Sequence, residues 1–365
     1  MIFLFNKTLT RVSKLKGRFL MPKVDSKLIA KLAGVSRSTV SRVLNGYSDI
    51  SEKTKEKILK IIKENGYYPN MSAQILAGKD SKIIGLLVYT GKSSKNVNER
   101  KKLTESLYYS QLIAEIIDEA ENLGYLVLIS YISNKKNDWK RIFENGVIDG
   151  AIVISGGKKI EEIEELINSK YKIVLLDYEE TIFNDFITTI KSNHFYGGYK
   201  ATEYLIKKGH KNILHLTGEI KRKITLQRAR GYLECLKDNN ILENKILVAK
   251  YDQKVAYNVI DGYIKSNRNF KYTAIFAGND YIALGTIRAL NDNKISVPNK
   301  VSVIGYDNME LCEYTSPRIT SVNHLGEGIA KKALIELINI LNGKKGGEEK
   351  IKLSIFERES VLKIF

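Results

Sequence analysis

Residues 29–46 constrain the fold of this chain most, because their pattern predicts two short helices joined by a tight turn. The first helix has an apolar side and ends at Gly34, and Val35 occupies the turn. Ser36 is a favourable N-cap for the second helix, whose apolar residues recur at helical spacing and face inward. Two helices joined by a turn of about three to four residues form a helix-turn-helix, which places its second helix in the major groove of DNA.

The outward face of the second helix carries arginine, hydroxyl and amide side chains, namely Arg37, Ser38, Ser41, Arg42 and Asn45. Such a face suits a groove lined by phosphates better than a protein core, so double-stranded DNA is the first partner to consider. An ordinary solvated helical hairpin with a few arginines is the alternative, although the motif here is long and ordered.

The charge of the chain supports this interpretation by its location more than by its total. The net charge is +18, but abundant Lys, Ile, Asn and Tyr with scarce Pro are also what an AT-rich genome produces. Residues 1–80 contain 16 Lys and Arg against 6 Asp and Glu. More than half of the excess charge therefore lies in the segment that contains the helix-turn-helix.

From Ser81 onward, apolar runs typical of buried strands alternate with amphipathic helices. The first run is Ile83–Val88, and the alternation restarts after Asp177. This pattern predicts an α/β core of two doubly wound lobes with parallel sheets. In such a core, small ligands bind in the cleft at the carboxyl ends of the strands.

The segment 29–46 and the residues after it resemble the DNA-binding headpiece of the lac repressor/galactose repressor (LacI/GalR) family of bacterial transcription factors. Ser51 is expected to start a third helix that runs to about Glu64, and residues 72–78 match the family's hinge helix. The resemblance extends from about Pro22 to the C-terminus. It implies an all-α helix-turn-helix domain followed by a core that is similar to periplasmic binding proteins.

The resemblance also implies a division of the chain into four parts. The expected parts are an extension at 1–21 that is disordered or a misassigned start, a headpiece at 22–69, a hinge helix and linker at 70–80, and an effector-binding and dimerisation core at 81–365. In the core, lobe 1 is expected at about 81–181 and 317–342, and lobe 2 at about 182–316 and 343–365, with crossings near Thr181, Ser316 and Gly343.

The resemblance assigns roles to the polar face of the second helix. Residues that match base-reading positions can discriminate guanine, since a guanidinium donates to two of its acceptors. Hydroxyl and amide side chains suit phosphate contacts, which fix the register on DNA, although Thr39 is nearly as well explained as a helix-surface residue. The base-reading candidates are Arg37, Ser38 and Arg42, and the backbone candidates are Ser36, Thr39, Ser41 and Asn45.

Asn70, Ala73 and Leu76 match the positions through which the family's hinge contacts the minor groove. Leu76 matches the leucine that the family inserts at the centre of a palindromic operator, where an apolar wedge kinks the DNA. Packing between domains is the alternative role for Leu76. The hinge is too short to be stable alone, so it is expected to order on DNA, in pairs across a homodimer.

Three core residues match positions that bind the effector in the family: Arg228, Asn279 and Asp307. A guanidinium and a carboxylate can each make two hydrogen bonds to vicinal hydroxyls, which favours a carbohydrate as the small-molecule effector. Asp280 is expected to cap the helix that follows it. Ser192 stands where the family often has Asp, so the resemblance does not carry the identity of the ligand.

Tyr108, Tyr109 and Phe195 are candidates for stacking on a sugar ring, although aromatic residues are as often part of a core. The four histidines, His194, His210, His215 and His324, show neither metal-ligand nor catalytic-triad spacing. The chain also lacks the Gly-rich motif of phosphate-binding loops and the Gly-x-Ser-x-Gly motif of hydrolases. We therefore expect no catalytic residues, no metal and no cofactor.

These patterns predict a ligand-controlled repressor that acts in the cytoplasm as a homodimer. Only two cysteines and no apolar run of membrane-spanning length fit a reducing compartment and no membrane contact. A regulator corepressed by a purine is the alternative within the family. A solute-binding protein of a transporter shares the core fold, but the headpiece and the missing signal peptide argue against it.

Overall fold

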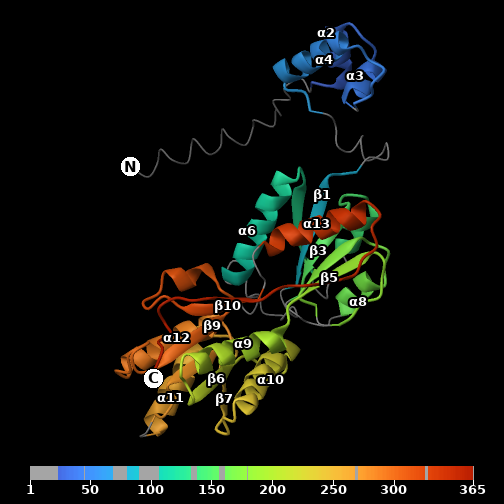
Figure 1. Ribbon diagram of the computed structural model, residues 1–365. Coiled ribbons are helices and arrows are strands. Elements are labelled where there is room, and N and C mark those ends of the chain that lie inside the picture. The colour runs from blue at the N-terminus through green and yellow to red at the C-terminus, as the bar shows by residue number, and fades with distance from the viewer. Residues whose placement is uncertain are drawn as a thin grey trace, which may run out of the picture. The chain divides into compact units, whose positions relative to one another are not determined.

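The computed structural model describes residues 24–44, 46–68, 80–89, 107–132, 138–155, 161–178, 180–267, 270–324 and 328–364. The chain divides into two compact units, Met1–Asp80 and Ser81–Phe365 (Figure 1). The first unit contains the helix-turn-helix segment and the second contains the alternating strands and helices.

Among the described residues of the first unit, a bundle is formed by the helices α2 (Ser26–Ala33), α3 (Arg37–Leu44) and α4 (Glu52–Glu64). Asp25 caps α2 by accepting a hydrogen bond from the backbone N–H of Leu28. A left-handed residue then ends α2, where Gly34 has a φ of 67° that glycine adopts without steric cost. A small apolar core joins the three helices, and it consists of Ile29, Ala30, Ala33, Val40, Val43 and Ile58.

The second unit contains two six-stranded sheets. In the first sheet the order is β11-β5-β4-β3-β1-β2, and all neighbours are parallel. Its strands are β1 (Ile83–Tyr89), β2 (Leu126–Ile132), β3 (Gly150–Ile154), β4 (Ile173–Leu176), β5 (Ile187–Lys191) and β11 (Glu348–Lys350). One face packs against α6 (Leu107–Asn122) and α13 (Ile329–Leu341), and the other against α7 (Asp138–Glu144) and α8 (Glu161–Ile167).

In the second sheet the order is β12-β10-β9-β8-β6-β7, and only the pairing of β12 with β10 is antiparallel. Its strands are β6 (Ile213–Thr217), β7 (Lys245–Val248), β8 (Ala274–Ala277), β9 (Ser302–Tyr306), β10 (Thr320–Asn323) and β12 (Ser354–Phe356). The helices on its faces are α9 (His194–Lys207) with α10 (Lys223–Asp238), and α11 (Gln253–Ser266) with α12 (Asp280–Asp292). A short 3-10 helix, η3 (Glu310–Glu313), follows β9.

The predicted fold class, an all-α headpiece and two doubly wound lobes, is confirmed. The strand pairing places each crossing between the sheets later than the expected positions near Thr181, Ser316 and Gly343, because β5, β10 and β11 end after them. Strands β5 and β10 escaped the sequence analysis because they are rich in threonine and serine. In the structure these polar side chains are buried, including Thr188 and Ser321.

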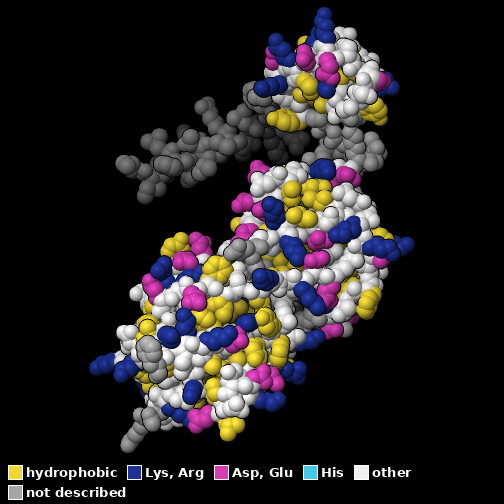
Figure 2. All heavy atoms as spheres, in the orientation of Figure 1, with side chains coloured by type: hydrophobic (Ala, Val, Ile, Leu, Met, Phe, Trp, Pro, Cys, Tyr) yellow, Lys and Arg dark blue, Asp and Glu magenta, His cyan; other side chains and the backbone are white. Residues whose placement is uncertain are grey.

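The visible surface of the core lobes carries basic and acidic side chains interspersed with one another (Figure 2). Within the part of the chain that the structure describes, no helix has the length and apolar character needed to cross a bilayer. The two cysteines, Cys235 and Cys312, are buried and not bonded to each other.

Candidate functional site

The exposed face of α3 is the first candidate site. The side-chain oxygen of Ser36 accepts a hydrogen bond from the backbone N–H of Thr39 at 3.1 Å, which confirms that Ser36 caps this helix. Val40 and Val43 are buried in the headpiece core, as their spacing predicts. The exposed residues on the opposite side are Ser36, Arg37, Ser38, Ser41 and Arg42, with Thr39 half-buried.

The two arginines of α3 are held in different ways. Arg37 donates a hydrogen bond from Nε to the hydroxyl of Ser26 at 3.3 Å. Arg42 forms an ion pair with Asp49, with 2.8 Å between Nη1 and Oδ2, and about half of each side chain is exposed. The contact with Asp49 was not predicted from the sequence. Arg37 and Arg42 remain predicted base-reading residues, and Arg42 has to exchange or share this partner to reach a base.

The remaining DNA-contact candidates lie outside the described residues. Asn45 at the end of α3 is one of them, and the hinge residues Asn70, Ala73 and Leu76 are the others. Their roles stay predictions from the sequence.

The second candidate site lies between the two lobes, at the carboxyl ends of the strands. Asp177 follows β4 in the first sheet, and Asp307 follows β9 in the second. Both have positive φ values, 53° and 108°, which are rare for residues other than glycine and concentrate at functional sites. His194 begins α9 directly after the first crossing, and His324 follows β10 at the second.

Arg228, on α10, is the central cation of this site, and only 3% of the residue is exposed. Its Nη1 donates to the carbonyl oxygen of Gly278 at 2.5 Å, and its Nη2 lies 3.7 Å from Oδ1 of Asp307. The guanidinium also stacks on the ring of Tyr306, 3.7 Å from the ring centroid. A carbonyl dipole, a carboxyl group and an aromatic face thus offset the cost of burying this charge.

Two glycines of α9 allow this packing. A Cβ atom on Gly198 would overlap the backbone of Arg228, and one on Gly197 would overlap the hydroxyl of Tyr306. The Gly-Gly pair therefore lets α9 approach α10 and β9 closely enough to enclose the guanidinium.

His194 connects Asp177 to this group. Its Nε2 lies 2.9 Å from Oδ2 of Asp177, and its Nδ1 lies 3.2 Å from the hydroxyl of Tyr306 and accepts from Nε of Arg228 at 3.4 Å. Because Nδ1 accepts, the proton of the neutral ring belongs on Nε2, from which it is donated to Asp177. Burial lowers the pKa of His194, with Arg228 acting in the same direction and Asp177 against it.

His324 lies on the other side of Asp307. Its Nδ1 is 3.4 Å from Oδ1 of Asp307, but this atom is buried and makes no hydrogen bond with the described residues. Its ring stacks on Tyr108, with 6.0 Å between the ring centroids and an interplanar angle of 13°. Burial lowers the pKa of His324 well below its usual value, and the nearby His194 and Arg228 act in the same direction.

The two carboxyl groups of the site differ in their pKa. Burial opposes the ionisation of Asp177, but its electrostatic interaction and hydrogen bond with His194, together with His324 and the N–H of Ser192, hold its pKa well below the ordinary range. Burial raises the pKa of Asp307 to about 8, even though Arg228 acts in the opposite direction. The cleft therefore combines an ionised carboxylate with a carboxyl group that titrates near neutral pH.

The structure brings two of the three predicted effector residues, Arg228 and Asp307, into direct proximity. Asn279 caps α12 through a hydrogen bond from the N–H of Ile282, at 2.9 Å, and its predicted contact with the effector stays a prediction. The expectation that Asp280 caps this helix was wrong. Asp280 is the first residue inside α12 and is fully buried, where it accepts hydrogen bonds from Ser321 and from the N–H of Met309.

Sequence reasoning missed Asp177, His194 and His324 as parts of the site. Asp177 could have been identified as a site residue from the sequence, since it directly follows a buried strand. The other two could not be found in this way, because His324 follows β10, a strand too polar to be predicted, and His194 contacts Asp177 only through the fold.

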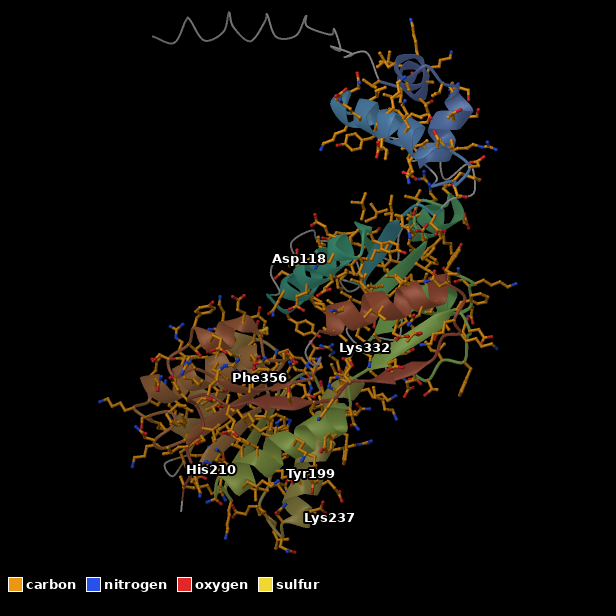
Figure 3. The ribbon with its side chains drawn as sticks, turned by 45° about the horizontal axis from the view of Figure 1, so that its top comes forward. Asp118, Tyr199, His210, Lys237, Lys332 and Phe356 are labelled. Carbon is orange, nitrogen blue, oxygen red and sulfur yellow. The ribbon has the colours of Figure 1, made fainter. Side chains whose placement is uncertain are left out.

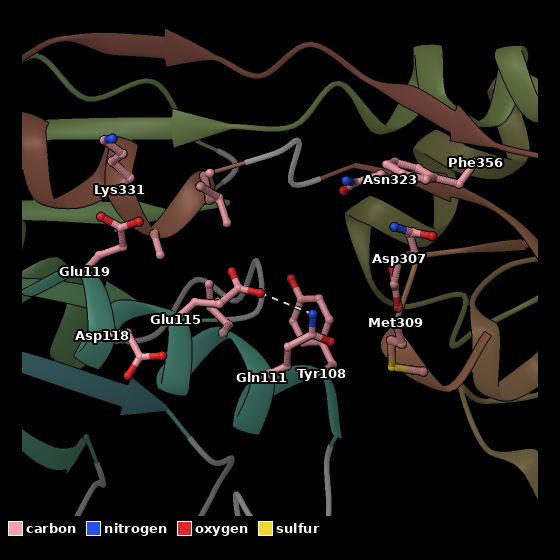
Figure 4. Close-up of a pocket in the computed structure, with 15 residues that line it drawn as sticks. Tyr108, Gln111, Glu115, Asp118, Glu119, Asp307, Met309, Asn323, Lys331 and Phe356 are labelled. Carbon is pink, nitrogen blue, oxygen red and sulfur yellow. Dashed lines mark hydrogen bonds between the residues drawn. The ribbon is translucent and has the colours of Figure 1, made fainter. Parts of the chain in front are cut away.

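A pocket with a volume of about 550 Å³ opens beside this group, between the lobes (Figure 4). Its volume lies within the range of small-molecule sites. The first lobe contributes residues of α6 and the start of α13, and the second contributes residues after β9 and in β12. The residues that line the pocket include Tyr108, Gln111, Glu115, Glu119, Lys331, Asp307, Met309 and Phe356.

Comparison with known proteins agrees with this two-part design. Residues 27–70 match the model of bacterial regulatory proteins of the lacI family, and residues 202–361 match a periplasmic binding protein-like domain. The repressor named PurR of Vibrio atlanticus is 31% identical over 343 residues, which cover 91% of this chain and 97% of that protein. The regulator named AscG of Escherichia coli is 27% identical over 318 residues, which cover 86% of this chain and 91% of that protein.

The structures of two regulators extend the similarity to the fold. The lac repressor bound to ONPG in the repressed state is 25% identical, with a TM-score of 0.73, over 93% of this chain and 99% of that chain. A CelR regulator in complex with cellobiose has a TM-score of 0.64 and is 22% identical, over 92% and 99% of the two chains. The fold and the match along almost the whole chain define a DNA-binding transcriptional regulator with an effector-binding core. The chain belongs to the lacI family of bacterial regulatory proteins.

Proposed function

We propose that this protein is a homodimeric repressor whose affinity for a palindromic operator is controlled by a carbohydrate bound between the core lobes. It acts in the cytoplasm on double-stranded DNA, and it catalyses no reaction. In this proposal Arg37, Ser38 and Arg42 read bases, and the hydroxyls of α3 contact the phosphates.

One observation carries the effector part of the proposal, which is the buried pairing of Arg228 with Asp307 beside the interlobe pocket. Asp307 lines the pocket and Arg228 pairs with it, so this carboxyl group is placed to bind adjacent hydroxyls on one ring. A solved regulator with this fold carries cellobiose, which fits the same chemistry. The residues proposed to bind the effector are Arg228, Asn279 and Asp307.

A purine acting as corepressor is the second candidate. The aromatic group around His324 favours it, because Tyr108 stacks on that ring and Tyr306 lies 5.2 Å from it, centroid to centroid. A planar heterocycle can extend such a stack, whereas a sugar uses its hydroxyls more than its faces.

A thermal-shift screen of sugars and purines on the full chain distinguishes these candidates. A ligand that binds only the folded protein raises the unfolding temperature, and the increase grows with the logarithm of its concentration relative to its Kd. The expected result is stabilisation by a sugar, and an operator selected from random DNA then binds more weakly in its presence. Stabilisation by purines alone, with tighter operator binding, would reject the carbohydrate in favour of corepression. A ligand that leaves operator affinity unchanged would refute effector control.

The hinge offers a separate test of the DNA part. If Leu76 wedges into the minor groove at the operator centre, Leu76→Ala weakens binding to the palindromic operator much more than binding to random DNA. Equal losses on both DNAs would reject the wedge.

A further inference from the structure

Three side chains that are distant in the sequence meet where the lobes join. Each of Asp177, His194 and His324 offers one ligand atom, and these atoms lie within 4.8 Å of one another. Asp177 belongs to the first sheet, whereas His194 and His324 flank the second, so the group spans the two lobes.

The ligand types and spacings suit a transition metal. Zn²⁺ binds imidazole nitrogen and carboxylate oxygen at about 2.0–2.2 Å, so the ligand atoms of a tetrahedral site lie about 3.4 Å apart. The observed 2.9 Å between Nε2 of His194 and Oδ2 of Asp177 is already close to that spacing. A shift of about 1 Å in the ring of His324 completes the three-ligand geometry.

The surroundings hold these side chains as outer partners hold metal ligands. The N–H of Ser192 donates to Oδ1 of Asp177 at 3.2 Å, which leaves Oδ2 directed at His194. The hydroxyl of Tyr306 lies 3.2 Å from Nδ1 of His194 and fixes the orientation of that ring. When Nε2 binds an ion, the ring proton moves to Nδ1, from which it is donated to this hydroxyl. The hydroxyl of Ser192 donates to the backbone oxygen of His324 at 2.9 Å, which positions the third residue.

A second observation points to a ligand independently of this clustering. Nδ1 of His324 is buried, and only 2% of the residue is exposed, yet this atom makes no hydrogen bond with the described residues. An unbonded polar atom in such a place costs free energy unless another group binds it.

The neighbouring charges act in both directions. Arg228 opposes a cation, because its Nε lies 3.4 Å from Nδ1 of His194, and Arg222 acts in the same direction from further away. Asp307 offsets this effect, since its carboxyl group lies 3.7 Å from Arg228 and 3.4 Å from His324.

We propose that Asp177, His194 and His324 form a binding site for a divalent transition metal ion such as Zn²⁺. Three protein ligands leave a further coordination position open, as in zinc sites that also bind water or a small molecule. Because the ligands come from both lobes, the bound ion favours the arrangement in which the lobes meet. The site does not depend on the proposed function, and its test uses no DNA.

Isothermal titration of Zn²⁺ into the full chain, without a histidine tag and after removal of metals with EDTA, tests the site. The expected result is one ion per chain, with an affinity that falls on the order of tenfold or more in His324→Gln and in Asp177→Asn. His210→Gln is the matched control, and its affinity stays unchanged. His210 lies in the second lobe (Figure 3). Its two ring nitrogens contact the hydroxyl of Thr273 and the backbone oxygen of Leu362.

X-ray absorption of the Zn²⁺-loaded wild-type chain identifies the ligands of the ion directly, so it tests the site even if the variants do not fold. The expected spectrum shows two imidazoles and oxygen ligands at about 2.0–2.2 Å. Zinc–sulfur distances of about 2.3 Å would assign the ion to Cys235 or Cys312 and overturn the proposal. Failure to bind Zn²⁺ stoichiometrically, or equal affinity in wild type and His324→Gln, would also overturn it.

Discussion

The arginines of the two candidate sites lie in opposite environments, exposed in one and buried in the other. On α3, Arg37 and Arg42 are exposed, and their only described partners are a surface hydroxyl, a surface carboxylate and the nearby ring of Tyr47. In the cleft, Arg228 is almost completely buried between a backbone carbonyl, an aromatic face and Asp307. The arginines of the headpiece face are available to a partner outside the chain, whereas the arginine of the cleft is surrounded by partners from the chain itself.

This difference separates recognition from stability. An exposed arginine contributes little to the free energy of unfolding, because water solvates it as well as a surface partner does. A buried arginine is coupled to the packing around it, so that a change in its partners disturbs the second lobe that encloses it. A protein that must bind DNA and also respond to a ligand gains from keeping these two kinds of site apart.

The largest expected effect comes from removing the buried cation. Arg228→Met removes the donor from two buried acceptors, the carbonyl oxygen of Gly278 and Nδ1 of His194, which lowers the free energy of unfolding by about 2–6 kcal/mol, at about 1–3 kcal/mol for each. Arg37→Met changes it by no more than about 0.5 kcal/mol, because the side chain is exposed. Urea unfolding of both variants, followed by circular dichroism, measures the contrast. Similar losses in the two variants would contradict it.

The close packing around the cleft can be tested with two glycines of the second lobe. Gly197→Ala places a methyl group against the hydroxyl of Tyr306 and is expected to cost about 1–3 kcal/mol. Gly262, inside α11, has no atom within 4 Å of an added Cβ, so Gly262→Ala gains about 0.5–1 kcal/mol of helix stability. Opposite signs in urea unfolding support the packing argument, and a neutral Gly197→Ala argues against it.

On the headpiece, the expected loss is in DNA recognition. Arg37→Ala is expected to lower the preference for the selected operator over DNA with a changed base by about 1–3 kcal/mol, while leaving stability unaltered. Fluorescence anisotropy with both DNAs measures this preference, and Arg288→Ala on α12 is the control for loss of an exposed charge. If Arg37→Ala instead weakens both complexes equally, Arg37 contacts the phosphates rather than a base.

The same contrast explains what the sequence could predict. The contacts that define the headpiece join residues close in the sequence, since the helix caps Ser36 and Ser51 and the buried Val40 and Val43 lie within one short segment. Helical periodicity and capping are properties of neighbouring residues, so they can be recognised without the fold. The contact between Arg42 and Asp49 was missed because it depends on the loop after α3.

The cleft is built from residues far apart, and periodicity says little about it. Arg228 and Asp307 were predicted because they lie in recognisable motifs, but the link through Asp177 and His194 required the packing of α9 against β9. Strands β5 and β10 could not be predicted, because their buried threonines and serines satisfy their hydrogen bonds only in the folded sheet. The sequence therefore does not indicate which strand His324 follows or which residues it contacts.

The smallest predicted effect concerns pH, where a buried carboxyl group differs from an exposed one. The pKa of Asp307 is raised to about 8 by burial, whereas an unfolded Asp titrates near about 3.9. Between these values the folded protein holds a proton that the unfolded chain has released, so this contribution to stability is lost as pH rises through about 8. The pKa values of His194 and His324 are lowered, so these histidines contribute little to the pH dependence of stability above about pH 6.5.

The free energy of unfolding is thus expected to fall by about 1–2 kcal/mol from pH 6.5 to 8, and Asp307→Asn is expected to remove this fall. Asp118→Asn, at an exposed position on α6, keeps the wild-type profile, and an unchanged profile in Asp307→Asn would show that another group titrates.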